Sequence, residues 1–169
     1  MTINYRKLLV VDDDQSVLDA YQDILADSDF SGVMELMEML PTESAAASLL
    51  ESSPAGFELV EANSAEEAIE RFSTAHSEGD PFAAVFLDVR MPPGMDGIDC
   101  AAELRKIDPQ VRLAIVSAYA DYSIEAIREK LGRDFIYLKK PFIPEELSQV
   151  AELYSCYLQR SIEGKCDTN

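Results

Sequence analysis

Five polar residues each stand directly after, or within two residues of, a short apolar run: Asp12, Asp13, Asp88, Ser117 and Lys140. Carboxylate oxygens are the ligands that Mg²⁺ prefers, and a protein-bound Mg²⁺ usually keeps waters and takes further oxygens from phosphate. An aspartate beside such a metal can attack a phosphoryl group, while a lysine amine and a serine hydroxyl neutralise the phosphoryl oxygens. These residue types therefore point to phosphoryl transfer, provided that the fold brings them together.

Five short runs rich in Val, Ile, Leu, Phe and Tyr predict the strands that position these residues: 8–11, 57–61, 82–87, 111–116 and 134–138. The third and fourth runs are almost continuously apolar, which is typical of strands buried on both faces of a parallel sheet.

Segments with helical spacing lie between the strands. The pattern Ser64-Ala-Glu-Glu67 is a capping box, and Pro144 suits the first turn of the last helix. Further helices are predicted at about 15–27, at 97–107, and at 121–131 with Asp121 as its cap. Alternating strands and helices predict an α/β class, doubly wound sheet whose ligand site lies at the carboxyl ends of the strands. All five polar residues then fall on one edge.

The composition excludes several kinds of function. Fourteen Lys and Arg stand against 32 Asp and Glu, a net charge of −18, so we expect no direct nucleic-acid binding. The cysteines Cys100, Cys156 and Cys166 are expected to be reduced bystanders, and the single His76 disfavours a zinc site. The apolar runs are too short for a signal peptide or membrane span, which indicates a cytoplasmic protein without membrane insertion.

One domain is expected over residues 1–160, with a helical insertion at about 28–56 after the first helix. Two interpretations of the insertion stay open: a segment that only packs on the domain, or a partner surface. Residues 161–169 are expected to be a flexible tail or the start of a connector.

Four motifs resemble the signatures of the receiver domain of two-component response regulators, in that family's order: VVDDD at 10–14, FLDVRMPPGMDG at 86–97, IVSAY at 115–119 and YLKKPF at 137–142. Each motif alone is weak evidence for this family, but four of them, each at a strand end, are strong evidence. The resemblance covers roughly residues 7–160 and implies a flavodoxin-like sheet of strand order 2-1-3-4-5. In this chain the loop that contains Pro93 and Gly94 is one residue longer than is usual in that family. The motifs also resemble receivers joined to histidine kinase or diguanylate cyclase modules.

The resemblance implies a role for each site residue. Asp88 would be the phosphoacceptor, and Mg²⁺ would be held by Asp12, Asp13, Asp88 and the backbone carbonyl of Arg90. Ser117 and Lys140 would bind the phosphoryl group, with a cis bond before Pro141. Ser117 and Tyr137 would be the switch pair that remodels the face formed by the fourth helix, fifth strand and last helix. Arg90 and Tyr119 are predicted to shield the acyl phosphate from water.

The implied partners are a histidine kinase or phosphotransfer protein and a downstream output module or protein, and a phosphorylation-dependent homodimer stays open. The chain would act as an enzyme only on itself, by catalysing its own phosphorylation and dephosphorylation. One alternative is an interaction module that works without phosphorylation. Another is a Mg²⁺-dependent aspartyl phosphatase, which is disfavoured because Val89 and Arg90, not a second acid, follow Asp88.

Overall fold

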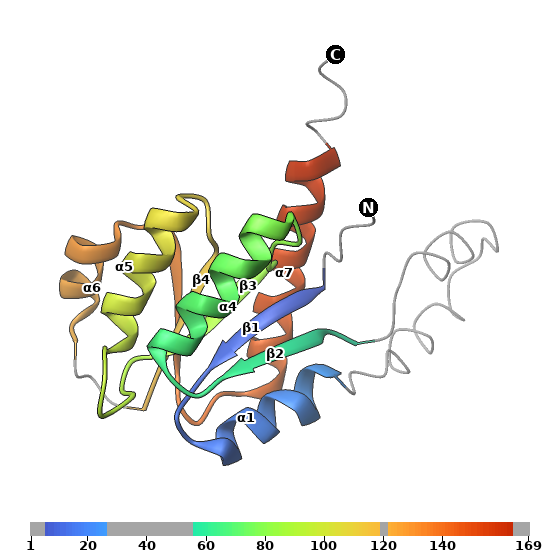
Figure 1. Cartoon of the computed structure of the whole chain (residues 1–169). Helices are drawn as coiled ribbons and strands as arrows, with labels where there is room; N and C mark the ends of the chain where they lie inside the picture. Colours follow the sequence, from blue (N-terminus) through green and yellow to red (C-terminus); the bar gives the residue numbers. More distant parts are fainter. Residues whose placement is uncertain (1–5, 27–55, 119–121, 164–169) are drawn as a thin grey trace.

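The computed structural model describes residues 6–26, 56–118 and 122–163. Its sheet has five parallel strands in the order β2-β1-β3-β4-β5, which confirms the predicted topology (Figure 1). The strands are β1 (Lys7–Val11), β2 (Glu58–Ala62), β3 (Ala84–Asp88), β4 (Leu113–Ser117) and β5 (Phe135–Lys139). The predicted insertion falls almost wholly outside the described residues.

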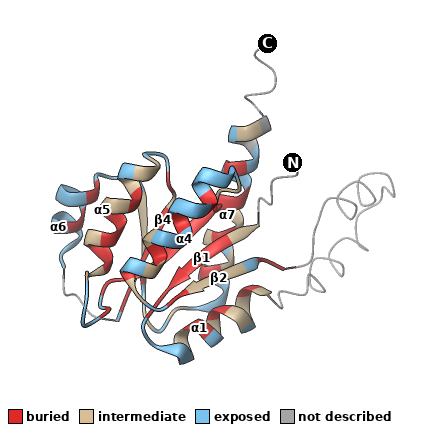
Figure 2. Ribbon diagram, viewed as in Figure 1, coloured by how far each residue is buried: buried red, intermediate tan, exposed pale blue. Residues whose placement is uncertain are grey.

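Helices cover both faces of this sheet: α1 (Gln15–Tyr21), α4 (Ala65–Glu78), α5 (Gly97–Ile107), α6 (Ile124–Leu131) and α7 (Pro144–Glu163). A π-helical turn, Gln22–Ala26, follows α1 and was not predicted. One core layer packs α4, α5 and α6 on the sheet, and the other packs α1, the π turn and α7. Buried residues line the sheet and the inner sides of the helices (Figure 2).

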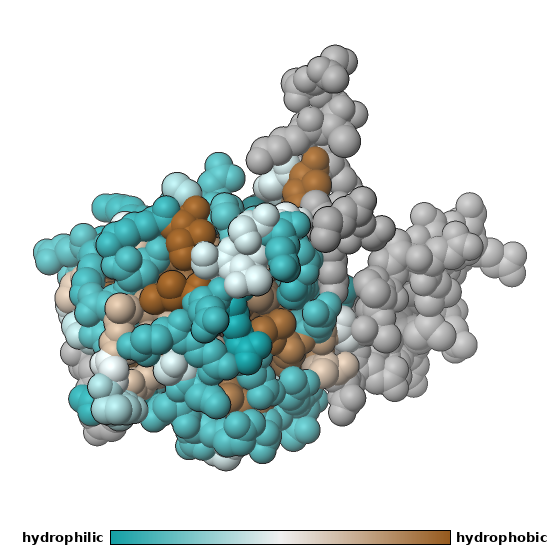
Figure 3. Space-filling view, viewed as in Figure 1, coloured by the Kyte–Doolittle hydropathy of each residue, from teal (hydrophilic) through white to brown (hydrophobic). Residues whose placement is uncertain are grey.

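Side-chain alternation along the central strands produces these two layers. In β1, Leu9 and Val11 belong to the first layer, whereas Leu8 and Val10 belong to the second. Strands β3 and β4 are buried along their whole length, which explains their continuous apolar sequence. The molecular surface seen in Figure 3 is mainly hydrophilic, with small separate hydrophobic patches. Among the described residues, no helix is long and apolar enough to cross a membrane.

Local signals fix most helix ends as predicted. The Ser64 hydroxyl accepts a hydrogen bond from the Glu67 N–H at 3.2 Å, and the Glu67 carboxylate accepts one from the Asn63 N–H at 2.9 Å. The prediction that Asp121 caps the fourth helix was wrong. Ser123 is the cap, because its hydroxyl accepts the Ala126 N–H at 3.1 Å.

The last helix continues three residues past residue 160, the predicted domain end. The Ser161 hydroxyl lies within this final turn, donates to the Tyr157 carbonyl at 2.8 Å, and accepts from Arg112 at 3.1 Å. At the other boundary, the Phe57 N–H donates to the Leu25 carbonyl at 2.9 Å. The chain therefore leaves and re-enters the sheet region at one place, so an insertion there does not interrupt the strand pairing.

Candidate functional site

Strands β1 and β3 end side by side, which brings three carboxylates together. Asp88 is the last residue of β3, and Asp12 directly follows β1, where its N–H donates to the Ala62 carbonyl at 3.1 Å. One carboxylate oxygen from each of Asp12, Asp13 and Asp88 lies within 4.8 Å of the other two. Asp12 is 1% exposed and Asp88 5%, while Asp13 is exposed. The fold thus places all three predicted acids at one point.

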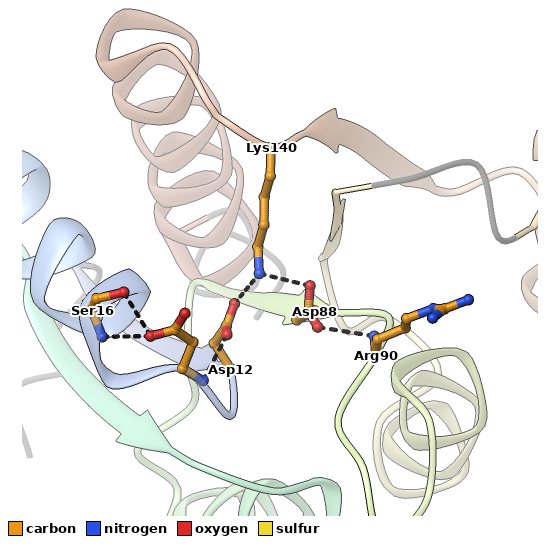
Figure 4. Close-up of polar contacts among 6 residues, drawn as sticks. Asp12, Ser16, Asp88, Arg90 and Lys140 are labelled. Carbon is orange, nitrogen blue, oxygen red and sulfur yellow. Dashed lines mark hydrogen bonds and ion pairs between the residues drawn. The ribbon is translucent and has the colours of Figure 1, made fainter.

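Lys140 reaches these acids from the end of β5. Its Nζ forms an ion pair with Asp12 Oδ2 and a second one, at 2.8 Å, with Asp88 Oδ1 (Figure 4). Its backbone N–H donates to the Ser117 carbonyl at 2.9 Å, which ties the chain after β5 to the end of β4. The Lys140–Pro141 peptide bond is cis. Lys140 therefore lies between the two buried carboxylates and partly neutralises them.

Burial and charge act against each other in this cluster. Burial raises the pKa of Asp88 above its usual range, although the hydrogen bonds from Lys140 and from the Arg90 N–H oppose the rise. Burial alone would lower the pKa of Lys140, but its hydrogen bonds to Asp12 and Asp88 outweigh that effect and raise it. Three carboxylates face one ammonium group, so the cluster can take up a further cation.

The third acid of the opening triplet has a different role. Asp14 is the N-cap of α1, where its carboxylate accepts the Ser16 N–H at 2.9 Å and the Ser16 hydroxyl at 2.6 Å (Figure 4). These hydrogen bonds hold the pKa of Asp14 below its usual range. The Asp14 N–H in turn donates to Asp12 Oδ1 at 3.0 Å, so the helix cap orients the buried acid.

The remaining predicted residues are placed as follows. Ser117 ends β4, is 4% exposed and lines the same cavity as the acids. The Arg90 N–H donates to Asp88 Oδ2 at 2.9 Å, while the Arg90 side chain extends away from that carboxylate (Figure 4). Tyr119 lies outside the described residues. The shielding role of Arg90 and Tyr119 therefore stays a prediction.

Tyr137 lies on β5 opposite Ile115 and is partly buried in the layer formed by α4, α5 and α6. Ser117 is two residues beyond Ile115 on β4, so it projects on the same side of the sheet. The two predicted switch residues thus share one face of neighbouring strands. Their concerted movement stays a prediction.

The cavity at this edge has a volume of about 480 Å³ and is lined by Asp12, Asp13, Asp14, Asp88, Arg90, Ser117, Ala118 and Lys140. This volume is in the range of small-ligand sites and accommodates a phosphoryl group beside a hydrated metal ion. Three hard oxygen donors in a partly desolvated cluster fit Mg²⁺. Residues Asp12, Asp13 and Asp88 would hold it.

Gly97, the first residue of α5, is a positioning residue that the sequence interpretation did not single out. A Cβ at this position would lie 1.9 Å from the Asp88 carbonyl oxygen and 2.8 Å from its carbon. The Gly97 N–H donates to the Val89 carbonyl at 2.9 Å. The start of α5 therefore rests directly on the backbone of Asp88, which only a glycine permits. A glycine at a helix start carries no such signal in a single sequence.

Comparison with known proteins identifies the family to which this chain belongs. The family described as response regulator receiver domain matches residues 41–152. The matched range begins after β1, so it does not include Asp12 and Asp13. These two acids are assigned to the site because β1 pairs with β3 in the sheet.

Curated relatives include the chemotaxis protein CheY of Thermotoga maritima, which is 35% identical over 96 residues covering 55% of this chain and 72% of CheY. The probable transcriptional regulator ycf27 of Cyanophora paradoxa is 31% identical over 147 residues, covering 87% of this chain and 47% of ycf27. The regulatory protein AtoC of Escherichia coli is 33% identical over 99 residues, or 57% of this chain, yet the match spans 20% of AtoC. The chain thus spans less than half of the two regulators.

Among solved structures, a CheY-like receiver domain protein from Methanospirillum hungatei has a TM-score of 0.62 at 21% identity, covering 95% of this chain and 99% of that one. The CheY of Borrelia burgdorferi, solved as a CheX-CheY-BeF3-Mg complex, has a TM-score of 0.58 at 22% identity, covering 88% and 91%. At these identities the likeness concerns the fold alone. From the family match, the relatives and the fold, this chain belongs to the response regulator receiver domains of two-component signalling.

Proposed function

We propose that the chain accepts a phosphoryl group on Asp88 from a histidine kinase or phosphotransfer protein. The observation that carries this proposal is the placement of Lys140 between Asp12 and Asp88, inside an open cavity at the carboxyl edge of the sheet. Asp88 is the acid of the cluster whose backbone is fixed on both sides, by strand pairing with Val116 and by the close approach of Gly97.

In the proposed transfer, a carboxylate oxygen of Asp88 forms a bond to phosphorus while the bond from phosphorus to the donor's imidazole nitrogen breaks. The electron pair of the broken bond stays on the imidazole, and the product is an acyl phosphate. Lys140 and the Ser117 hydroxyl are placed to contact the transferred phosphoryl oxygens and to neutralise their charge. The protein's part is therefore to position the nucleophile and offset the charge.

Mg²⁺ would supply additional neutralisation of the phosphoryl oxygens and of the acid cluster. Asp12, Asp13 and Asp88 would hold it, and the backbone carbonyl of Arg90 is the further ligand that the family resemblance implies. In support, the Borrelia CheY was solved as a complex with CheX, BeF3 and Mg²⁺. On this proposal the chain catalyses only its own phosphorylation and dephosphorylation.

Ser117 and Tyr137 would convert phosphorylation of Asp88 into a change of the protein surface. We expect Ser117 to move toward the phosphoryl group and Tyr137 to follow it, which remodels the surface formed by α6, β5 and α7. That surface would pass the signal to an output module or partner protein. Two of the relatives are named as regulators and are much longer than the part that this chain matches, which agrees with an output beyond the receiver.

The direct test is to incubate the chain with Mg²⁺ and acetyl phosphate and to record the intact mass. We expect one added phosphoryl group that disappears on mild alkaline hydrolysis, as an acyl phosphate does. Omitting Mg²⁺ or adding a chelator should reduce the labelled fraction strongly. A folded chain that stays unlabelled with Mg²⁺ would leave an interaction module without phosphorylation as the better description.

Gly97→Ala should lower both stability and labelling. The new methyl group would collide with the Asp88 backbone, so we expect a loss of about 1–3 kcal/mol in the free energy of unfolding and slower labelling. Gly79→Ala is the matched control, because Gly79 has a φ of 73° but open space around its Cβ position, far from the site. This control should lose stability, by about 1–2 kcal/mol, yet keep the labelling rate. Equal labelling of the two variants would contradict the positioning role of Gly97.

A further inference from the structure

A second cavity, of about 500 Å³, lies at the amino ends of β4 and β5, on the edge of the sheet opposite Asp88. Three arginines, one aspartate, one glutamine and a group of apolar side chains line it, among them Arg105, Arg112, Arg133, Asp134, Leu153 and Tyr157. In Figure 1 the amino ends of the strands lie on the side of the molecule where α7 ends. The three arginines come from separate elements and meet only because β4 and β5 are neighbours.

No ion pair joins these arginines to a carboxylate among the described residues. Asp134 does line the same cavity, and the charge of Asp108 opposes the lowering of the Arg112 pKa by burial. Arg105 donates to the backbone carbonyl of Asp134 at 2.5 Å, and its Nε is buried without a hydrogen-bond partner. Arg112 donates to the neutral hydroxyl of Ser161 at 3.1 Å. Three guanidinium groups line the cavity against the single lining carboxylate of Asp134, and this excess of positive charge favours an external anion.

The tyrosine at the base of the cavity shows that two of these charges converge. The Tyr154 hydroxyl donates to the Leu113 carbonyl at 3.0 Å. Burial raises the pKa of Tyr154 to about 12. The charges of Arg112 and Arg105 act against that rise, and the charge of Asp134 adds to it. Two guanidinium groups and one carboxylate, that of Asp134, therefore act on the Tyr154 hydroxyl, while Arg133 is an exposed residue of the same lining.

The opposite wall is apolar and open to solvent. Leu153 is 46% exposed and Tyr157 is 48% exposed on the outer side of α7, next to the partly buried Phe135. A charged side and an apolar side within one cavity of this size are typical of sites for small organic ligands. Guanidinium groups bind phosphate oxygens in pairs, and a tyrosine ring packs well on a planar group.

We infer that this cavity binds a small phosphate-bearing molecule, with its phosphate at Arg105, Arg112 and Arg133 and a planar apolar part against Tyr157 and Leu153. A mononucleotide has the size and the chemistry of such a ligand. The inference does not depend on phosphorylation of Asp88, because the cavity shares no residue with that site.

The test is calorimetric titration of the whole chain with AMP, adenosine and inorganic pyrophosphate in Mg²⁺-free buffer. We expect saturable binding of AMP and pyrophosphate, and at least tenfold weaker binding of adenosine. Arg133→Gln and Arg112→Gln should each weaken AMP binding about tenfold. Arg133 is exposed, so its replacement leaves the fold intact even if the Arg112 variant does not fold.

The matched control is Arg128→Gln, an exposed arginine on α6 that does not line the cavity. It should bind AMP as the unmodified chain does, and so should Asp88→Asn, which separates this inference from the proposed phosphorylation. The inference is overturned by absence of saturable AMP binding at millimolar concentration, by equal weakening in Arg128→Gln, or by adenosine binding as tight as AMP. It is also overturned if light scattering shows a dimer that Arg133→Gln converts to monomers, since a second copy then occupies the cavity.

Discussion

Asp88→Asn should abolish incorporation of phosphate from acetyl phosphate in the presence of Mg²⁺. The asparagine side chain has no carboxylate to form the acyl phosphate. Its carbonyl oxygen can still accept from Lys140, while its amide nitrogen replaces the oxygen that accepts the Arg90 N–H, so one hydrogen bond is lost. We therefore expect a folded protein whose intact mass does not change. Because burial already raises the pKa of Asp88, a neutral side chain is tolerated at this position.

The control for this experiment is Asp96→Asn, at the end of the loop that joins β3 to α5. Asp96 caps α5 by accepting the Asp99 N–H at 2.8 Å, and asparagine caps helices equally well. This variant also removes one carboxylate, but not one that lines the cavity, so it should keep full labelling. If Asp88→Asn were labelled like the unmodified chain, the acceptor would have to be another carboxylate, with the exposed Asp13 as the first candidate.

The sheet could be predicted from sequence because its central strands are buried on both faces and are therefore almost continuously apolar. The strand ends were less accurate: the predicted runs 82–87 and 111–116 correspond to Ala84–Asp88 and Leu113–Ser117. Hydrophobic pattern stops at the first polar residue, whereas pairing of Asp88 with Val116 and of Ser117 with Lys139 extends the strands. The polar site residues are thus part of the sheet itself, which fixes their positions.

The side-chain contacts of the site could not be predicted in the same way. Strand order places Lys140 near the acids. Only the structure shows that its ammonium group bridges Asp88 and Asp12, which is 128 residues away in the sequence. The cavity lined by arginines could not be predicted from the sequence, because Arg105, Arg112 and Arg133 have no regular spacing. Their meeting depends on the adjacency of β4 and β5 and on where α7 crosses them.

Lys140→Met should destabilise the chain by about 3–5 kcal/mol in Mg²⁺-free buffer, the usual cost of removing one partner from a buried ion pair. The Lys140 side chain is 17% exposed, and its partners Asp12 and Asp88 are 2% and 7% exposed, so water cannot replace the lost charge well. Urea unfolding monitored by circular dichroism measures the effect. Lys139→Met is the matched control, since Lys139 is an exposed neighbour with no ion pair among the described contacts, and it should change stability little.

Mg²⁺ should reverse much of this loss, which links the stability of the fold to its proposed chemistry. In the unmodified chain Lys140 already occupies the space between the acids and offsets their repulsion, so a metal ion adds to an arrangement that is partly neutralised. In Lys140→Met the same acids have no cation, and a metal that binds only the folded state stabilises it by RT ln(1 + c/Kd), where c is the free Mg²⁺ concentration. We therefore expect a larger increase in the urea midpoint on adding Mg²⁺ to Lys140→Met than to the unmodified chain, together with loss of efficient labelling. Equal Mg²⁺ effects on both proteins would mean that the metal and the lysine do not act on the same carboxylates.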